Sequence, residues 1–246
     1  MRIIQAEEIT RVVRRLCIDA NCHLTDDLKN CITACRACEP FPVAQGILDQ
    51  IIENYQIADQ NNVPVCQDTG MACVFIDVGQ DVHVEGSIED AIHEGVRQGY
   101  CDGYLRKSVV RDPLDRVNTG DNTPAMIYYN IVPGDKIKIT VAPKGFGSEN
   151  MSQIKMLKPS DGLQGVKDFV LKVVEDAGPN PCPPIVVAWA SAVRLIRPHS
   201  WPRKRFCATL TPATKTPSMQ ILKTNCCKRS TVWALARRAL AVKPRR

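Results

Sequence analysis

The strongest constraint on folding in this 246-residue chain is an abrupt change of composition at Ala188. Residues 189–246 contain 14 Lys and Arg but no Asp or Glu, and they hold all three Trp residues. The other 18 Lys and Arg and all 26 Asp and Glu lie in residues 1–188, which therefore carry a net charge of −8. We expect a folded domain in residues 1–187 and a poorly packed tail in residues 188–246.

Before the break, the hydrophobic pattern alternates between helix and strand. Amphipathic helices are predicted over residues 6–20, 46–62 and 166–178, with Gly178 ending the last of them. Strand patterns occupy "MACVFIDVG" and "DKIKITVAP", the second alternating Ile137, Ile139 and Val141, and "PPIVV" should form another strand. The sequence therefore predicts a mixed α/β fold in which helices pack on a β-sheet.

The hydrophobic segments and the cysteine spacing indicate a protein of a reducing compartment. No stretch approaches the ~18 consecutive apolar residues that span a bilayer, and the N-terminus lacks the apolar region of a secretory signal, so we expect a cytoplasmic protein. The 12 Cys do not follow the spacing of a disulfide scaffold. Cys31, Cys35 and Cys38 could imitate a metal site, but their spacing is also one helix face, and we favour packing for them and for Cys17 and Cys22.

The stretch "VPVCQDTGMACVF" carries the first chemical signal. Cys66, Gln67 and Asp68 stand at the mouth of a predicted strand, where polar side chains would be exposed beside a thiol. An ordinary turn is an equally good interpretation of these residues alone.

Two further stretches are consistent with chemistry. In "APKGFGSENMS", Gly145 and Gly147 could direct backbone amides at an anion near Lys144, with a helix opening at Ser148. The turn is neither a Walker A loop nor a dinucleotide-binding fingerprint. In "GPNPCPPIVV", prolines stiffen the loop around Cys182, which suits either a metal ligand or a plain turn.

These motifs, with "EGVRQGYCDGYLRKSVVRDPLDRVNTGDNTPA", resemble one family in one order. Across residues 1–187 the chain resembles the α subunit of the class I, iron–sulfur fumarate hydratases and L(+)-tartrate dehydratases. The resemblance implies the fold of that family's N-terminal domain. It also implies a [4Fe-4S] cluster held by three thiolates, of which Cys66 and Cys182 supply two, with one iron left open for substrate.

The resemblance also implies a substrate site for a small dicarboxylate. Gln67 and Asp68 would line it, Arg106 would clamp a carboxylate with its planar fork, and the Gly147 amide would add an anion contact. Three residues of "NTGDNTPA" belong to a family motif without an assigned role: Asn118, Thr119 and Asp121.

The implied reaction is reversible addition of water across a carbon–carbon double bond. The general base is expected on the C-terminal domain, which two-subunit members encode as a separate β chain, so this chain should be inactive alone and part of an α2β2 assembly. "PKGFGSENMS" is more similar to the fumarase branch, so we expect fumarate hydration to (S)-malate, with L(+)-tartrate dehydration as the alternative.

A lost base near codon 188 explains the tail. The family continues with "GVGIGGT" where this chain has "AWASAV". One coding of Ala188 to Val193 is GCG TGG GCA TCG GCG GTA, and one G in front makes it GGC GTG GGC ATC GGC GGT, which encodes GVGIGG. The same one-base shift gives amino-acid sequences similar to those of the family at two later stretches of the tail. The third cluster cysteine would then be missing, leaving a truncated, inactive subunit in which Cys207, Cys226 and Cys227 occur by chance.

Two other classes stay open. The basic tail could bind nucleic acid, with an affinity that falls steeply as salt rises. Alternatively, the cysteines could bind zinc in a non-catalytic subunit, which metal analysis would reveal as zinc without sulfide.

Overall fold

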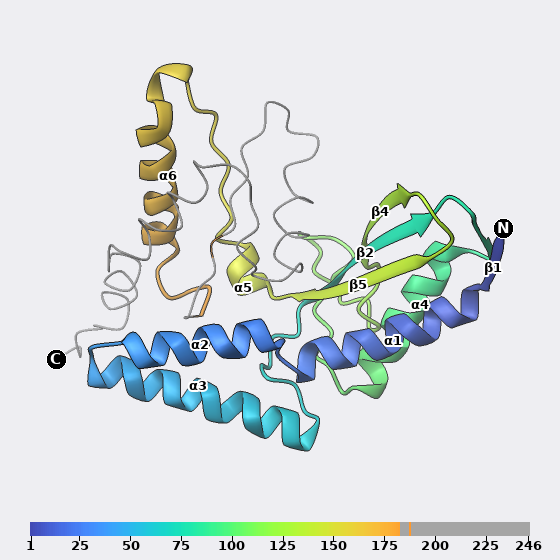
Figure 1. Cartoon of the computed structure of the whole chain (residues 1–246), viewed down its shortest axis with the longest axis horizontal. Coiled ribbons are helices and arrows are strands. Elements are labelled where there is room, and N and C mark those ends of the chain that lie inside the picture. Colours follow the sequence, from blue (N-terminus) through green and yellow to red (C-terminus); the bar gives the residue numbers. More distant parts are fainter. Residues whose placement is uncertain (183–186, 188–246) are drawn as a thin grey trace. The chain divides into compact units, whose positions relative to one another are not determined.

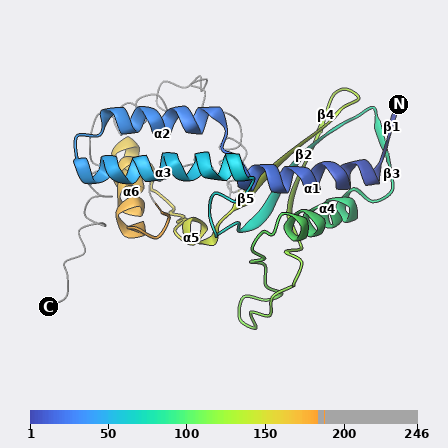
Figure 2. The same cartoon turned by 90° about the horizontal axis from the view of Figure 1, so that it is seen from below.

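The computed structural model describes residues 1–182 and residue 187, and the chain forms two compact units. Of the described residues, 1–145 belong to the first unit and those from Phe146 onward to the second. The two views in Figures 1 and 2 show helices and small sheets, which confirms the mixed α/β prediction. The predicted strand at 183–187, apart from Val187, and the tail at 188–246 lie outside the described residues, so the boundary at 187 stays a prediction.

The first unit contains the same arrangement twice, a short strand that leads directly into a helix. β1 (Arg2–Gln5) leads into α1 (Ala6–Cys22), and β3 (Val82–Glu85) leads, after a short turn, into α4 (Ile88–Asp102). β1 and β3 pair in parallel, so the two helices leave the same end of this small sheet. They lie side by side in Figure 1.

Glycines allow α1 and α4 to approach closely. Gly95 and Gly99 lie one turn apart on the face of α4 that meets α1, and the C-cap residue Gly103 continues this row beyond the end of the helix. A Cβ atom at Gly99 would lie 2.8 Å from the Arg14 carbonyl oxygen and 2.8 Å from Cys17 Cβ. Any larger side chain there would push the helices apart.

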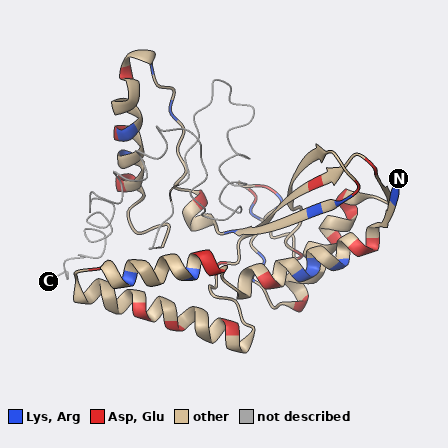
Figure 3. Cartoon of the chain, viewed as in Figure 1, with Lys and Arg blue, Asp and Glu red and all other residues tan. Residues whose placement is uncertain are grey.

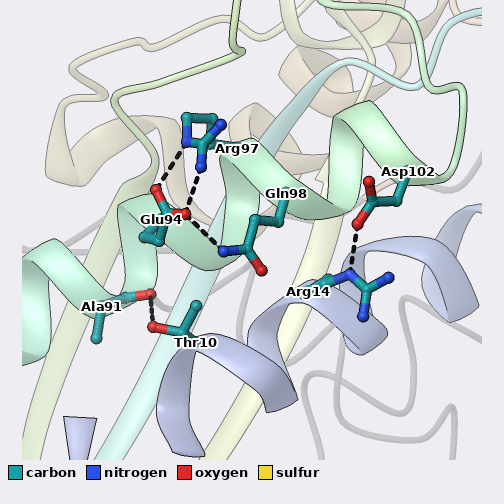
Figure 4. A network of polar contacts seen from close by, with 7 residues as sticks. All are labelled: Thr10, Arg14, Ala91, Glu94, Arg97, Gln98 and Asp102. Carbon is teal, nitrogen blue, oxygen red and sulfur yellow. Dashed lines mark hydrogen bonds and ion pairs between the residues drawn. The ribbon is translucent and has the colours of Figure 1, made fainter. Parts of the chain in front are cut away.

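Polar contacts fix the register of these two helices, as Figure 4 shows. The Thr10 hydroxyl of α1 donates to the Ala91 carbonyl of α4 at 3.0 Å. At the other end, Arg14 Nε lies 2.6 Å from Asp102 Oδ2. Both partners of this ion pair are partly exposed, so we expect it to contribute at most about 1 kcal/mol. The outer face of α4 carries a separate hydrogen-bonded group: Glu94, Arg97 and Gln98.

The second sheet of the first unit has three strands. β2 (Met71–Gly79) is central, with β4 (Met126–Val132) parallel on one side and β5 (Ile137–Lys144) antiparallel on the other. One face of β2 contributes three buried side chains to the core that α1 and α4 cover: Ala72, Val74 and Ile76. Each buried Val or Ile stabilises the fold by roughly 1.5–3 kcal/mol. The alternation predicted for β5 is confirmed, because its apolar residues pack on this core: Ile137, Ile139 and Val141.

Helices α2 (Asp26–Cys38) and α3 (Pro42–Asn61) lie side by side in Figures 1 and 2. The helix predicted over residues 46–62 corresponds to α3, which begins four residues earlier and is capped by Asn62 in the left-handed conformation, with φ 52°. The packing prediction was wrong for Cys31 and Cys38, which are exposed. The reason is that α3 is the one described element with which α2 makes an extended contact, so the other faces of α2 are not enclosed.

Among the remaining structural predictions, those for Cys17, Cys22 and Gly178 are confirmed and the one for Ser148 is wrong. Cys17 and Cys22 are buried, as predicted, and burial raises the pKa of the Cys17 thiol to about 12. In the second unit, α6 (Gly162–Ala177) ends at Gly178, also as predicted. The four-residue helix α5 (Phe146–Glu149) begins two residues before Ser148, so the predicted start was wrong. A single 3₁₀ turn, η1 (Pro159–Asp161), precedes α6.

Charge on the described helices is mixed or acidic. Figure 3 marks acidic and basic residues along α1 and acidic residues along α3, whose sequence contains no Lys or Arg. These helices offer no surface that favours a phosphate backbone, and the basic tail lies outside the described residues. Among the described helices, none combines the length and the hydropathy that crossing a bilayer requires.

Candidate functional site

The residues that lead into β2 form a tethered segment with exposed chemistry. Cys66 and Gln67 are exposed, whereas Thr69 and Gly70 are buried. The segment is held just before Cys66, because the Val65 N–H donates to the carbonyl of Asn21 in α1 at 3.0 Å and the Val65 carbonyl accepts from Asn54 of α3 at 2.8 Å. Residues of α1 and α3 therefore hold the chain just before the exposed Cys66 thiol, a few residues ahead of the start of β2.

The Cys66 sulfur is surrounded by polar groups of its own turn. It accepts the backbone N–H of Asp68 at 3.4 Å, and its thiol donates to Gln67 Oε1 at 3.5 Å. Thiolate sulfur is a soft ligand for metals, and the exposed Cys66 sulfur is accessible for such a role.

Two glycines bring the segment against the end of β5. Gly70 has φ 58°, and a Cβ atom there would lie only 2.1 Å from the Lys144 carbonyl oxygen. At Gly145 a Cβ atom would lie 2.8 Å from Asp68 Oδ2. The Asp68 carboxylate therefore occupies space that only a glycine at position 145 leaves open. Asp68 and Gly145 both belong to the first unit.

Arg106 lies beside this segment because their backbones are joined. The Thr69 hydroxyl donates to the Arg106 carbonyl at 2.8 Å, and the buried Tyr100 hydroxyl donates to the Thr69 carbonyl at 2.9 Å. Burial raises the pKa of Tyr100, so its hydroxyl keeps its proton. The Arg106 side chain is exposed, and among the described residues it has no carboxylate partner. A cation in this state is available to an anionic ligand.

Asn122 locks the Arg106 turn to the segment at β2. Its side chain is fully buried, and Oδ1 accepts the N–H groups of Ser108 at 2.7 Å and Val109 at 3.1 Å. Its Nδ2 donates to the Gly70 carbonyl at 3.1 Å. The sequence analysis did not select Asn122. The one indication in the sequence was that this polar residue lies inside the predicted turn "TGDNTPA".

The other motif residues support the same loop. Asn118 Nδ2 donates to the Lys107 carbonyl at 3.0 Å, and the Thr119 hydroxyl donates to the Val109 carbonyl at 3.3 Å. Burial acts to raise the pKa of the Asp121 carboxyl, but hydrogen bonds from Thr123 outweigh it and hold that pKa below its usual value. These contacts give Asn118, Thr119 and Asp121 a structural role.

In the second unit, Gly147 and the turn of Cys182 lie close together. A Cβ atom at Gly147 would come 3.0 Å from the Asn180 carbonyl oxygen, two residues before Cys182. The Cys182 N–H donates to the Pro179 carbonyl at 3.1 Å, and Cys182 is exposed with φ 56°.

The predicted site residues thus form two groups. The first unit holds Cys66, Gln67, Asp68 and Arg106, and the second holds Gly147 and Cys182. Within the described part of the chain, no three metal-binding side chains gather into one site. The meeting of Cys66 and Cys182 at one cluster stays a prediction.

The sequence profile of a family described as "Fumarate hydratase (Fumerase)" matches residues 10–191, which include both groups. The chain belongs to the fumarate hydratase family. A protein of Methanocaldococcus jannaschii, provisionally named L(+)-tartrate dehydratase subunit alpha, is 41% identical over 187 residues, which cover 73% of this chain and 65% of that protein.

Relatives in Escherichia coli support the same membership in the fumarate hydratase family. The L(+)-tartrate dehydratase subunit alpha of strain UTI89 is 29% identical over 73% of this chain, and that of strain K12 is 28% identical over the same share. The chain spans 60% of the length of each, so it corresponds to about two thirds or less of the relatives it matches. The resemblance seen in the motifs is confirmed.

Proposed function

We propose that this chain is the α subunit of an iron–sulfur hydro-lyase that reversibly hydrates fumarate to (S)-malate. The supporting observation is that Asn122 and Thr69 lock the Cys66–Gly70 segment to the Arg106 turn. These contacts join the backbone of Arg106, whose side chain is exposed, to the segment that carries the Cys66 thiol, the Gln67 amide and the Asp68 carboxylate. A diacid substrate and a soft metal centre need this set of groups.

The two cysteines fit an iron–sulfur cluster by the chemistry of their donors. Cys66 and Cys182 are exposed thiols, and Cys66 Sγ already accepts a backbone N–H. We propose them as two of the cluster's thiolate ligands, with the third supplied downstream in the corrected reading frame. When bound, a [4Fe-4S] cluster with an open iron supplies a Lewis acid that polarises substrate oxygens.

The chain's own residues would bind and orient the diacid. The Arg106 fork would hold one carboxylate by two parallel hydrogen bonds. Gln67 can donate to and accept from substrate oxygens, while Asp68, seated against Gly145, can accept from a substrate hydroxyl. The Gly147 amide would add a further contact to an anion. Two carboxylates held in fixed positions leave one carbon–carbon bond exposed for hydration.

The proton would be moved by another chain. The matched relatives are named α subunits, which supports a β partner for this chain. We propose that the β subunit carries the general base, in an α2β2 assembly, and that the fold of residues 1–187 is that of the family's N-terminal domain.

L(+)-tartrate is the second candidate substrate. The relatives reported above are named for L(+)-tartrate dehydration, whereas the matching family is named for fumarate hydration. The two substrates share their dicarboxylate frame, so the groups of the first unit suit both.

The decisive experiment is anaerobic reconstitution of the frame-corrected chain, which regains the third cluster cysteine, with iron, sulfide and the β subunit, followed by assays with fumarate, (S)-malate and L(+)-tartrate. Cys66→Ala should lower the bound iron and abolish turnover. Arg106→Lys keeps the charge but loses the fork, and we expect KM to rise about tenfold or more. Arg11→Lys, on an exposed face of α1, is the matched control and should leave KM unchanged. Zinc without sulfide, or no turnover of any diacid, would refute the proposal.

We also propose that residues 188–246 are translated out of frame. Resequencing the gene around codon 188 tests this directly. An unaltered reading would return the basic tail to consideration as a functional segment, and a salt-sensitive affinity for nucleic acid would then be the measurement to make.

A further inference from the structure

One buried tyrosine is bonded to both segments of the proposed substrate site. Tyr100 lies in the last turn of α4 and is 1% exposed, in the core that α4 shares with α1. Its hydroxyl donates to the Thr69 carbonyl at 2.9 Å, and its own carbonyl accepts the Leu105 N–H at 3.1 Å. Thr69 directly follows Asp68, and Leu105 directly precedes Arg106. The two ends of Tyr100 therefore hold the residues next to Asp68 and Arg106.

Thr69 closes these contacts into a ring of hydrogen bonds. Its hydroxyl donates to the Arg106 carbonyl at 2.8 Å, so the two segments are joined directly as well as through Tyr100. Thr69 and Tyr100 are both buried, and a hydrogen bond away from water is electrostatically stronger than an exposed one. The backbone at Arg106 is thus fixed relative to the backbone next to Asp68.

Helix packing, and not the loops, determines where the Tyr100 hydroxyl lies. There is no spare space beside it between α4 and α1, because a Cβ atom at Gly99 would lie 2.8 Å from Cys17 Cβ. The side-chain amides of Asn21 and Asn122 also lie within hydrogen-bonding range of the Tyr100 hydroxyl. A side chain held by packing and by further polar partners is suited to fix a binding segment in place.

We propose that Tyr100 is a positioning residue for the substrate site. Acting through Thr69, its hydroxyl sets the spacing between the backbone positions from which Arg106 and Asp68 extend their side chains. This inference rests on the proposed function, and Tyr100 itself touches no substrate. A diacid that contacts a cation and polar groups at the same time binds well only if those groups keep a fixed separation, and small displacements are costly.

The test compares wild type with Tyr100→Phe, which removes one oxygen atom and keeps the ring in the core. Both are reconstituted as the frame-corrected chain with iron, sulfide and the β subunit, and steady-state kinetics are measured with fumarate, (S)-malate and L(+)-tartrate. KM should rise about tenfold while kcat changes less than about twofold, because substrate binding is loosened and the reacting groups are retained. The iron and sulfide contents should match those of wild type.

A double-mutant cycle tests the path through Thr69. Thr69→Val keeps the shape of the side chain but loses the hydroxyl, whereas Thr69→Ser keeps the hydroxyl and should stay much closer to the wild-type KM. If Tyr100 acts through Thr69, KM of Tyr100→Phe/Thr69→Val should rise by less than the product of the two single increases. Increases that multiply in full would refute this path.

A matched control separates positioning from a general loss of stability. Ile92→Val removes one methylene from a fully buried position two turns earlier in α4. It should lower the urea midpoint, as Tyr100→Phe does, but leave KM unchanged. An unchanged KM in Tyr100→Phe, or an equal rise in Ile92→Val, overturns this inference alone. A wild-type assembly that turns over none of the diacids overturns the proposed function and this inference with it.

Discussion

The Asp68 carboxylate lies against Gly145, where a Cβ atom would come within 2.8 Å of Asp68 Oδ2. The two residues are 77 positions apart and meet because Gly70 lets the chain cross the end of β5. The nearest atom belongs to the end of a side chain, so a larger residue at 145 would displace the carboxylate rather than the backbone.

Gly145→Ala should therefore reduce activity more than stability. We expect kcat/KM of the reconstituted enzyme to fall by about tenfold to a hundredfold, because displacing a positioned group by a fraction of an ångström is costly. Gly46→Ala, at a helical glycine of α3 with no atom within 4 Å of the new Cβ, is the matched control. Steady-state kinetics and urea unfolding of both variants check this, and equal kinetics in the two variants would contradict it.

Asn122 should be among the most costly polar residues to remove. Asn122→Ala removes the side-chain partner of two partly buried N–H groups and of the buried Gly70 carbonyl, which predicts a loss of roughly 3 kcal/mol in the free energy of unfolding. Asn122 also has φ 64°, so Asn122→Gly separates the lost hydrogen bonds from backbone strain. Asn130→Ala removes an exposed hydrogen bond to Asp77 and should cost less than about 1 kcal/mol. Similar urea midpoints for the variants at 122 and 130 would argue against this role.

The contact of α1 with α4 should tolerate no side chain at Gly99. Gly99→Ala places a methyl group 2.8 Å from the Arg14 carbonyl, and overpacking of this kind costs about 1–3 kcal/mol. Asp102→Asn, which removes the partly exposed ion pair to Arg14, should cost less than about 1 kcal/mol. Thermal or urea unfolding of the two variants ranks them, and the reverse ranking would show that the helices can move apart freely.

Cys17 should make the protein less stable at alkaline pH. Burial raises the pKa of its thiol to about 12, so between about pH 9 and pH 12 the unfolded chain loses this proton while the folded chain keeps it. The free energy of unfolding should then fall by about 1.4 kcal/mol per pH unit from this group. Cys17→Ser lacks an ionisable thiol and should show a shallower decline above pH 9 in urea titrations. Tyr100, whose pKa burial also raises, remains in both proteins, so parallel curves would exclude Cys17 as the cause.

The amino-acid sequence by itself determined several elements of the fold and the family, but it did not predict β1, β3, α4 or β4. Periodicity placed α1, β2, β5 and the end of α6, because a helix or strand face is decided by neighbours a few residues away. The motifs around Cys66, Arg106 and Cys182 carried the family resemblance. Local pattern could not decide whether the face of α2 with Cys31 is covered, since that depends on which other elements pack on it.

Only the tertiary structure decided how the site is held together. Asn122 reaches Gly70 across 52 residues, Thr69 reaches Arg106 across 37, and Asp68 meets Gly145. These contacts join segments whose sequence signals are ordinary turns, and a turn's composition does not say which distant backbone it will bind. For the same reason the hydrogen bond from Tyr100 to Thr69 has no signature in the sequence. It follows from the burial and packing that the folded chain imposes.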